Sequence, residues 1–345
     1  MKKNNFSSLR QNNNQTSKSN DVTVSSSKKI TNHNFIQEKN NNFPGGSGMS
    51  TSQKSNIVFG NSNSSSSTNG PSSKSIIQKI KMAKTSGIIN LSSMNMDSLP
   101  NEIFDINSKV DGLNWWEIVE ITKIDASSNK FIEVNNNFSF LPQLNYLKFS
   151  NNLFAQVPMS VYNLKNLKYL DFSNNEIVDI GFNISNMVSL VDLNFSSNKL
   201  CSIPNEINAL KNLEIFNVSN NKIKFLPMGF KLPILKKLDI SENLFISLSP
   251  DMENLVQLEE LLAFKNKIDR IENNCLDKLT NLKFLDLHIN LLQTFTSVPR
   301  SDKLDTIILG NNKLEKILNL DNCKNITVLD LSSNKLENFP QIGNL

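Results

Sequence analysis

One 15-residue pattern recurs along most of this chain, and it constrains the fold more than any other feature. Its clearest copy, LVDLNFSSNKLCSIP at residues 190–204, has the spacing L-xx-L-x-F-xx-N-x-L-xx-I-P. Leu193 and Phe195 have the two-residue period of a β-strand, so both side chains point to one face. Copies begin every 22 to 24 residues with an aliphatic residue, at Ile121, Leu144, Leu167, Leu190, Leu213, Leu235, Leu258, Leu282, Leu304 and Ile326.

The turn after each predicted strand carries an asparagine in ten coils. An earlier, degenerate coil lies at Ile89, Leu91, Met94 and Met96, which makes eleven in all. An Asn side chain offers an acceptor and two donors, so it can satisfy backbone groups of the turn and of the neighbouring coil. We therefore predict a ladder of turn asparagines: Asn129, Asn152, Asn175, Asn198, Asn221, Asn243, Asn266, Asn290, Asn312 and Asn334.

A single coil of this kind cannot fold alone. Burying its roughly seven apolar side chains contributes about 1.5–3 kcal/mol each, whereas ordering its backbone costs about 1–2 kcal/mol for every residue. Each coil must therefore gain burial and strand pairing from its neighbours. We predict an α/β fold: a curved, horseshoe-shaped leucine-rich repeat solenoid with a parallel β-sheet on its concave face, preceded by a disordered tail.

Residues 1–74 form that predicted tail. They are rich in Ser and Asn, and the first 75 residues hold nine Lys and Arg against two acidic residues. So few apolar groups cannot offset the entropy of ordering. A basic arm for acidic surfaces or nucleic acid is one interpretation. A solvated tail with no specific nucleic-acid partner is favoured, because the positive charges are scattered rather than clustered.

A short amphipathic helix is predicted at 75–87. Its apolar side chains share one face, with two lysines away from it: Ile76, Ile80 and Ala83 against Lys79 and Lys81. We expect this face to cover the end of the first coil, because terminal repeats need a polar outer cap. The alternative is a basic helix on a membrane surface, which three turns with few large side chains would bind weakly.

The repeat domain is predicted at 88–345, with about eleven coils. Its first turn-to-turn interval is lengthened by an insert at 105–120. The insert contains Trp115 and Trp116, the two tryptophans of the chain. A plug over the widened first coil is favoured over an anchor for a partner.

Several features favour an intracellular protein. No window approaches 18 uninterrupted apolar residues, so no transmembrane segment is expected, and the start MKKNNFSSLRQNNNQ lacks the apolar core of a signal peptide. Cys201, Cys275 and Cys323 lie on coils too far apart for disulfide geometry. A cytoplasmic location is predicted, and a nuclear one stays open.

The sequence contains few of the residue combinations that catalysis uses. The chain has two histidines, His33 in the tail and His288 alone in the repeats. No phosphate-binding glycine loop, CxxC or HExxH motif is present. We predict no catalytic residue, cofactor or metal. Asp171, Asp239 and Asp286 recur in register on the strands, which indicates a solvated inner wall.

The strongest candidate site is a group of apolar side chains on three neighbouring coils. Most coils place Asp or Asn between the two buried strand residues and Ser after them, but the coils beginning at Leu258, Leu282 and Leu304 depart from this rule. An apolar patch with aromatic anchors is typical of a binding surface, although mutual packing without a partner stays open. The candidate residues are Leu262, Phe264, Lys265, Phe284, His288, Ile289 and Ile308. A weaker candidate is the group of Tyr146, Lys148 and Tyr169.

The N-terminal repeats also carry a family resemblance. The run KMAKTSGIINLSSMNMDSLPNEIF, the insert with Trp115-Trp116-Glu117 and the run ITKIDASSNKF resemble the opening of the family of leucine-rich repeat-containing protein 40. The later coils, with Ile203-Pro204 before Ile207 and Leu210, are similar to the Ras-suppressor and adenylyl-cyclase class of repeats. The resemblance implies an intracellular, non-enzymatic repeat protein. It also implies further repeats after Leu345, where this sequence stops.

The sequence therefore predicts a non-enzymatic scaffold that binds a protein partner on its concave face. A small-GTPase effector or regulator in signalling is the alternative, by analogy of repeat class. A regulatory repeat fragment of a larger enzyme is the second alternative. Because the last coil has no capping segment after it, we also expect self-association through that end.

Overall fold

The computed structural model describes residues 72–104, 118–134, 138–320 and 323–338. The chain divides into two units, residues 1–64 and 65–345, and every described residue belongs to the second. The predicted tail therefore lies outside the described residues, apart from its last three positions. So does the tryptophan insert, apart from residues 118–120.

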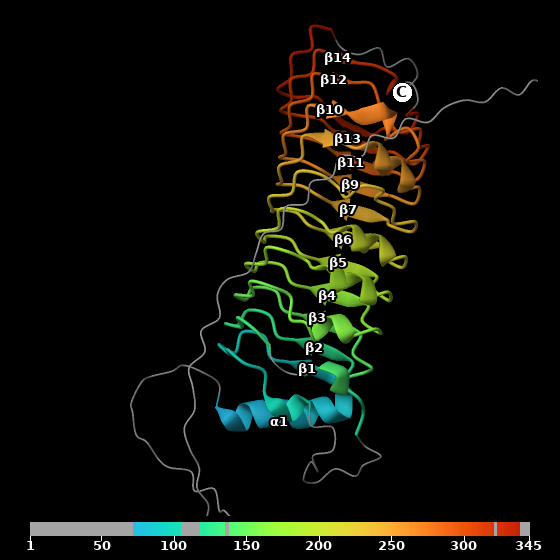
Figure 1. Ribbon diagram of the computed structural model, residues 1–345. Helices are drawn as coiled ribbons and strands as arrows, with labels where there is room; N and C mark the ends of the chain where they lie inside the picture. The colour runs from blue at the N-terminus through green and yellow to red at the C-terminus, as the bar shows by residue number, and fades with distance from the viewer. Residues whose placement is uncertain (1–71, 105–117, 135–137, 321–322, 339–345) are drawn as a thin grey trace, which may run out of the picture. The chain divides into compact units, whose positions relative to one another are not determined.

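One eleven-stranded parallel sheet runs through the second unit, with its strands in chain order (Figure 1). The strands are β1 (Ile88–Asn90), β2 (Lys123–Asp125), β3 (Tyr146–Lys148), β4 (Tyr169–Asp171), β5 (Asp192–Asn194), β6 (Ile215–Asn217), β7 (Lys237–Asp239), β9 (Glu260–Leu262), β11 (Phe284–Asp286), β13 (Thr306–Ile308) and β15 (Val328–Asp330). The central residue of each strand pairs with the central residue of the next, as Leu238, Leu261 and Leu285 do. Because the register is the same throughout, each strand residue lies beside the equivalent residue of the neighbouring coil. The predicted solenoid and parallel sheet are confirmed.

The return side of the coils is built from short elements. Two small parallel sheets join β8 (Ser247–Leu248) to β10 (Arg270–Ile271) and β12 (Thr294–Phe295) to β14 (Lys316–Ile317). The sequence pattern did not predict these pairs. Short 3-10 helices lie on the same side, two of them directly after β8 and β10: η1 (Asn101–Ile103), η3 (Phe138–Phe140), η4 (Val161–Asn163), η5 (Phe182–Asn186), η6 (Asn205–Ala209), η7 (Pro250–Asn254) and η8 (Glu272–Asn274).

The interior is apolar and continuous from coil to coil. The seven apolar side chains at the repeat positions of the coil that begins at Leu190 are buried: Leu190, Leu193, Phe195, Leu200, Ile203, Ile207 and Leu210. Phenylalanine rings stack along the same position in successive coils, with ring centroids of Phe172 and Phe195 5.9 Å apart. Stacking thus provides the burial that a lone coil lacks.

The asparagine ladder is confirmed in detail. The amide nitrogen of Asn198 donates to the carbonyl of Phe195 in its own turn at 3.1 Å and to that of Phe172 in the preceding coil at 2.9 Å. Its amide oxygen accepts the backbone N–H of Ile177 in that preceding coil at 2.9 Å. Each ladder residue therefore closes its own turn and fastens it to the coil before.

A left-handed backbone conformation recurs just before the turn asparagines. One residue in each of eleven turns has φ between 52° and 57°, the left-handed region that most side chains avoid. Short polar residues occupy most of these positions, and a β-branched apolar residue occupies one. The residues are Ser93, Ser128, Asn151, Asn174, Ser197, Asn220, Glu242, Lys265, Ile289, Asn311 and Ser333.

Helix α1 (Ser73–Ser86) lies across the β1 end of the sheet (Figure 1). Ser72 caps its first turn, and Gly87 ends it at φ 71° with its N–H on the carbonyl of Ala83. Ile80 and Ala83 are buried in the core. Lys79, which the sequence places away from the apolar face, is half-buried, and its Nζ donates to the carbonyl of Asn90 at 2.9 Å.

Candidate functional site

The exposed face of the eleven-stranded sheet is built from the residues that flank each buried central strand residue; we call it the sheet face. In the usual coil, a strand carboxylate or amide accepts hydrogen bonds from the serine two positions later. Asp239 of β7 shows this pattern, with its Oδ1 accepting from the backbone N–H of Ser241 at 3.0 Å and from its hydroxyl at 2.6 Å. The side chains of this motif satisfy each other's hydrogen-bonding groups, so most of the face is polar and already paired internally.

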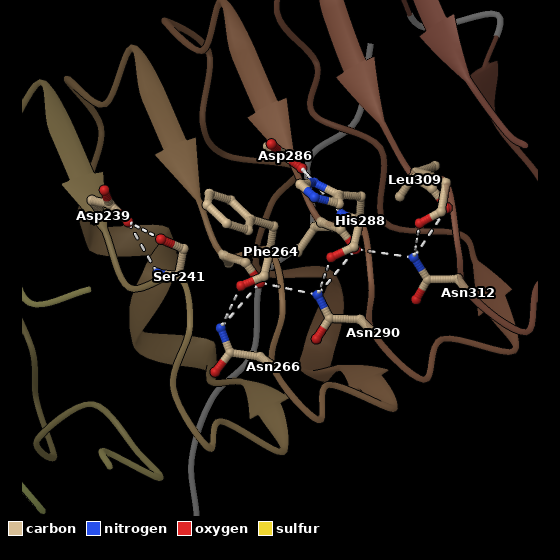
Figure 2. A network of polar contacts seen from close by, with 12 residues as sticks. Asp239, Ser241, Phe264, Asn266, Asp286, His288, Asn290, Leu309 and Asn312 are labelled. Atoms are coloured by element: carbon tan, nitrogen blue, oxygen red, sulfur yellow. Dashed lines mark hydrogen bonds and ion pairs between the residues drawn. The ribbon is translucent and has the colours of Figure 1, made fainter. Parts of the chain in front are cut away.

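Coils β9 and β11 replace that serine with rings. Phe264 and His288 stack with centroids 4.7 Å apart and planes 12° from parallel (Figure 2). Nδ1 of His288 lies 2.6 Å from Oδ1 of Asp286, and its backbone N–H donates to the same oxygen at 3.1 Å. Both rings are half-buried. This stack is the mutual packing that the sequence left open as one interpretation.

The apolar patch is less continuous than the sequence pattern indicated. Leu262 and Ile308 both pair with Asp286, so a carboxylate lies between the two apolar side chains in the middle of the patch. Phe284 occupies the other row of the face, where it pairs with Glu260 and Thr306. Leu262, Phe284 and Ile308 are half-buried.

The prediction that the strand aspartates mark a solvated wall is wrong for two of three. Asp286 is buried and in contact with Nδ1 of His288, and Asp171 is buried as well. Asp239 is half-buried, and burial raises its pKa although hydrogen bonds from Ser241 act in the opposite sense. Asp286 contacts the His288 ring and Asp171 lies 4.0 Å from Nζ of Lys148, contacts between residues that a pattern of single positions does not reveal.

Ile289 is the most exposed apolar side chain of the candidate group. Its side chain is 44% exposed, and its backbone has φ 52°. A β-branched residue in the left-handed region is a true outlier, with a cost of order 1–3 kcal/mol. Neighbouring coils hold it there, because its N–H donates to the carbonyl of Gly310 at 2.9 Å and its carbonyl accepts from the backbone N–H of Asn266 at 3.2 Å. Lys265 is exposed beside it and forms an ion pair with Glu242 at 2.6 Å.

The structure also brings the weaker candidates together. Tyr146 and Tyr169 stack on β3 and β4 with centroids 4.2 Å apart and planes 3° from parallel. Nζ of Lys148 lies 4.0 Å from Oδ2 of Asp171. Beside the tyrosines, burial and the nearby carboxylate of Asp171 raise the pKa of Asp192 to about 6. Sequence reasoning did not single out Asp192.

Asp330 was also missed as a site residue, although Gly310 carries the signal for it. A Cβ built on Gly310 would lie 2.8 Å from Oδ2 of Asp330 and 3.0 Å from the Ser332 hydroxyl oxygen. The absence of a side chain at Gly310 therefore lets the Asp330 carboxylate lie over this glycine, just after the end of β13. A glycine where other coils have serine is the pattern that indicates this.

The residues that the structure describes contain no group of three or more His, Cys, Asp or Glu side chains arranged to hold a metal ion. Cys201, Cys275 and Cys323 are free thiols. Among the helices so described, none has the length and apolarity needed to cross a membrane.

Comparison with known sequences finds short matches. No family model matches the chain. It is 31% identical over 138 residues to leucine-rich repeat-containing G-protein coupled receptor 5 of Rattus norvegicus, a match to 32% of this chain and 15% of the receptor. It is 39% identical over 102 residues to keratocan of Bos taurus, 28% of each chain. The chain thus covers less than a third of the length of either relative.

Solved structures match over a longer part of the chain. The leucine-rich repeat domain of APL1B has a TM-score of 0.60 at 18% identity, covering 78% of this chain and 83% of that one. A leucine-rich repeat protein of Leptospira interrogans has a TM-score of 0.58 at 26% identity, covering 73% and 69%. This chain has the leucine-rich repeat fold. A third solved structure, the plant peptide hormone receptor RGFR1 in complex with RGF2, has a TM-score of 0.55 at 20% identity, covering 69% and 42%.

Proposed function

We propose that this leucine-rich repeat protein is a non-enzymatic scaffold that binds a protein partner on its sheet face, around β9, β11 and β13. The observation that carries the proposal is Ile289. Nothing in the fold requires an isoleucine there, because the ten equivalent turns use Ser, Asn, Glu or Lys. A strained and exposed apolar side chain is typical of a site retained for function rather than stability.

The surroundings of Ile289 support the same proposal. The stacked rings of Phe264 and His288 lie on the adjoining coils, and half-exposed aromatic side chains are typical anchors of protein interfaces. Leu262 and Ile308 add apolar surface on either side of Asp286. Solenoids present extended surfaces of this kind to their ligands, and the similar structure of RGFR1 was solved in complex with RGF2.

Affinity purification of the full chain tests this proposal. The wild type is compared with the Ile289→Asn variant and with Asn174→Ser, a matched change at the equivalent turn after β4. We expect one discrete partner to be retained by the wild type and by Asn174→Ser and lost from Ile289→Asn. A partner retained equally by all three would contradict binding through this part of the sheet face.

The finer expectations stay predictions. A small GTPase as partner rests on repeat class alone, and a pull-down with GTPase in each nucleotide state tests it. Three other statements are likewise proposals: that the chain is a regulatory fragment of a larger enzyme, as an alternative, that it resembles leucine-rich repeat-containing protein 40, and that it is cytoplasmic. Imaging of the tagged full chain tests the location.

Self-association is proposed for the β15 end. Leu329 and Leu331 of the last described coil are only half-buried, whereas the equivalent residues of the preceding coil, Ile307 and Leu309, are fully buried. We expect light scattering to show dimers or larger species for the 345-residue chain. A polar capping helix added after the last residue should restore a monomer.

A further inference from the structure

The sheet face from β7 to β15 has an unbalanced charge. Two lysines of this face are already paired, Lys237 with Glu260 and Lys265 with Glu242, each at 2.6 Å. Three carboxylates, those of Asp239, Asp286 and Asp330, lie in one row of the face, and no ion pair of the described residues joins any of them to a lysine or arginine. A partner that covers this face therefore has to bring positive charge.

Asp330 is the carboxylate best placed to receive that charge. Asp286 is buried and contacts His288 Nδ1, whereas Asp239 and Asp330 each accept hydrogen bonds from both donors of the serine two positions later. Asp330 accepts the backbone N–H of Ser332 with Oδ1 at 2.8 Å, while its Oδ2 extends into the space where Gly310 lacks a side chain. Hydrogen bonds from Ser332, with a smaller contribution from His288, keep the pKa of Asp330 below its ordinary value. The group is therefore anionic at neutral pH.

The ring stack lies on the other side of Gly310. His288 of the β11 coil precedes Gly310 of the β13 coil at the same position of the repeat, and Phe264 lies behind His288 in a nearly parallel plane (Figure 2). A flat cation can pair with a carboxylate at its edge and contact an aromatic ring with its face. Guanidinium has this geometry, whereas ammonium is a compact, strongly hydrated charge.

We propose that Asp330, positioned by Gly310, and the Phe264–His288 stack form a subsite for an arginine side chain of an extended peptide segment in the partner. The inference rests on the proposed function, since it names the chemistry of the ligand for the same surface. Leu262, Ile289 and Ile308 contact the apolar residues that flank this arginine. The ligand is a basic and apolar peptide rather than an acidic one.

Peptide selection tests this proposal even though the partner is not identified. A random phage-displayed peptide library is selected on the immobilised full chain, and enriched peptides are synthesised with their arginine unchanged or replaced by citrulline, its neutral isostere. We expect enrichment of one arginine flanked by apolar residues, and a loss of affinity of about tenfold or more on replacement by citrulline, equivalent to about 1.4 kcal/mol.

Three variants locate the subsite. Asp330→Asn should lower the affinity of the arginine peptide to that of the citrulline peptide, and combining the two changes should cost no more than either alone. Gly310→Ser restores the serine of the other coils and displaces the flexible end of Asp330, so it should have the same effect while thermal stability is kept. Asp239→Asn, the matched control on β7, should change affinity by about twofold or less.

The outcomes separate this inference from the proposed function. Peptides that lose binding in Ile289→Asn but tolerate citrulline or Asp330→Asn would overturn the arginine subsite and leave the binding surface intact. Peptides that bind equally to Ile289→Asn and to the wild type would overturn the binding surface itself. A library that enriches acidic peptides, or none, would refute a basic peptide as the ligand.

Discussion

The strain at Ile289 can be isolated by comparing two substitutions at that position. Ile289→Thr keeps a β-branched side chain in the left-handed region, whereas Ile289→Asn introduces a residue that adopts this region readily. Both replace an apolar group by a polar one of similar size, so the loss of apolar packing is similar in the two variants. The difference between them then measures the backbone strain.

The general cost of left-handed backbone sets the expected size of that difference. Left-handed backbone costs most residues about 1–2 kcal/mol, and asparagine avoids much of this cost through local hydrogen bonds. We therefore expect Ile289→Asn to be more stable than Ile289→Thr by about 1–2 kcal/mol. In a repeat domain of this size, this corresponds to a difference of about 2–4 °C in the thermal midpoint for each kcal/mol.

Asn174 provides the matched control for this comparison. It has the same φ of 52°, it is exposed, and its backbone makes the equivalent hydrogen bonds to the adjoining coils. Asn174→Thr should lower stability by the same amount of about 1–2 kcal/mol that separates the two variants at position 289. Thermal and chemical denaturation measure both differences. Equal midpoints for the two Ile289 variants, with a clear loss in Asn174→Thr, would refute strain at Ile289.

Three further predictions concern the ladder, the core and the titration of the sheet face. Asn221→Ala should lower the free energy of unfolding by about 1–3 kcal/mol, because it leaves the Leu200 N–H and several buried carbonyl groups without their partner. Asn334→Ala, on the half-buried last coil, should lower it less. Equal midpoints of the two variants in chemical denaturation would contradict this. Leu261→Asp should abolish the native circular dichroism signal, because Leu261 is fully buried. The double variant Phe264→Asp with Ile308→Asp should keep that signal and lose the partner. If the double variant is unfolded, those two residues serve packing alone. Asp192 has a pKa raised from 3.8 to about 6 in the folded protein, so its ionisation opposes folding and stability should fall as pH rises from about 4 to 6. Asp192→Asn should reduce that decline in thermal midpoints, and an unchanged pH profile would refute the raised pKa.

The fold was predictable because the repeat is redundant. Eleven copies of the Leu193-x-Phe195 type of spacing determine which side chains are buried, and the asparagine ladder determines where each strand ends. The β8–β10 and β12–β14 pairs were not predictable, since the residues between repeats follow no fixed spacing. The turn conformation of Ile289 also follows from the repeat, although its cost becomes apparent only when φ is known.

The sequence predicted which residues make up the candidate site, but not how they are arranged. Departures from the Asp and Ser pattern identified Phe264, His288 and Ile308, but not how they contact one another. Whether Phe264 faces solvent or His288 depends on distances across two coils. The coverage of Asp286 and the position of Asp330 over Gly310 depend on contacts between coils, which a repeat pattern read one coil at a time does not show.

Site-specific photo-crosslinking tests the binding surface most directly. A photoreactive phenylalanine analogue is placed at position 289 on the sheet face or at position 178, where Val178 is 58% exposed on the return side of its coil. After irradiation of the full chain in extracts of its source cells, we expect a discrete partner adduct from position 289 and none from position 178. An adduct from position 178 with none from 289 would contradict partner binding on the sheet face.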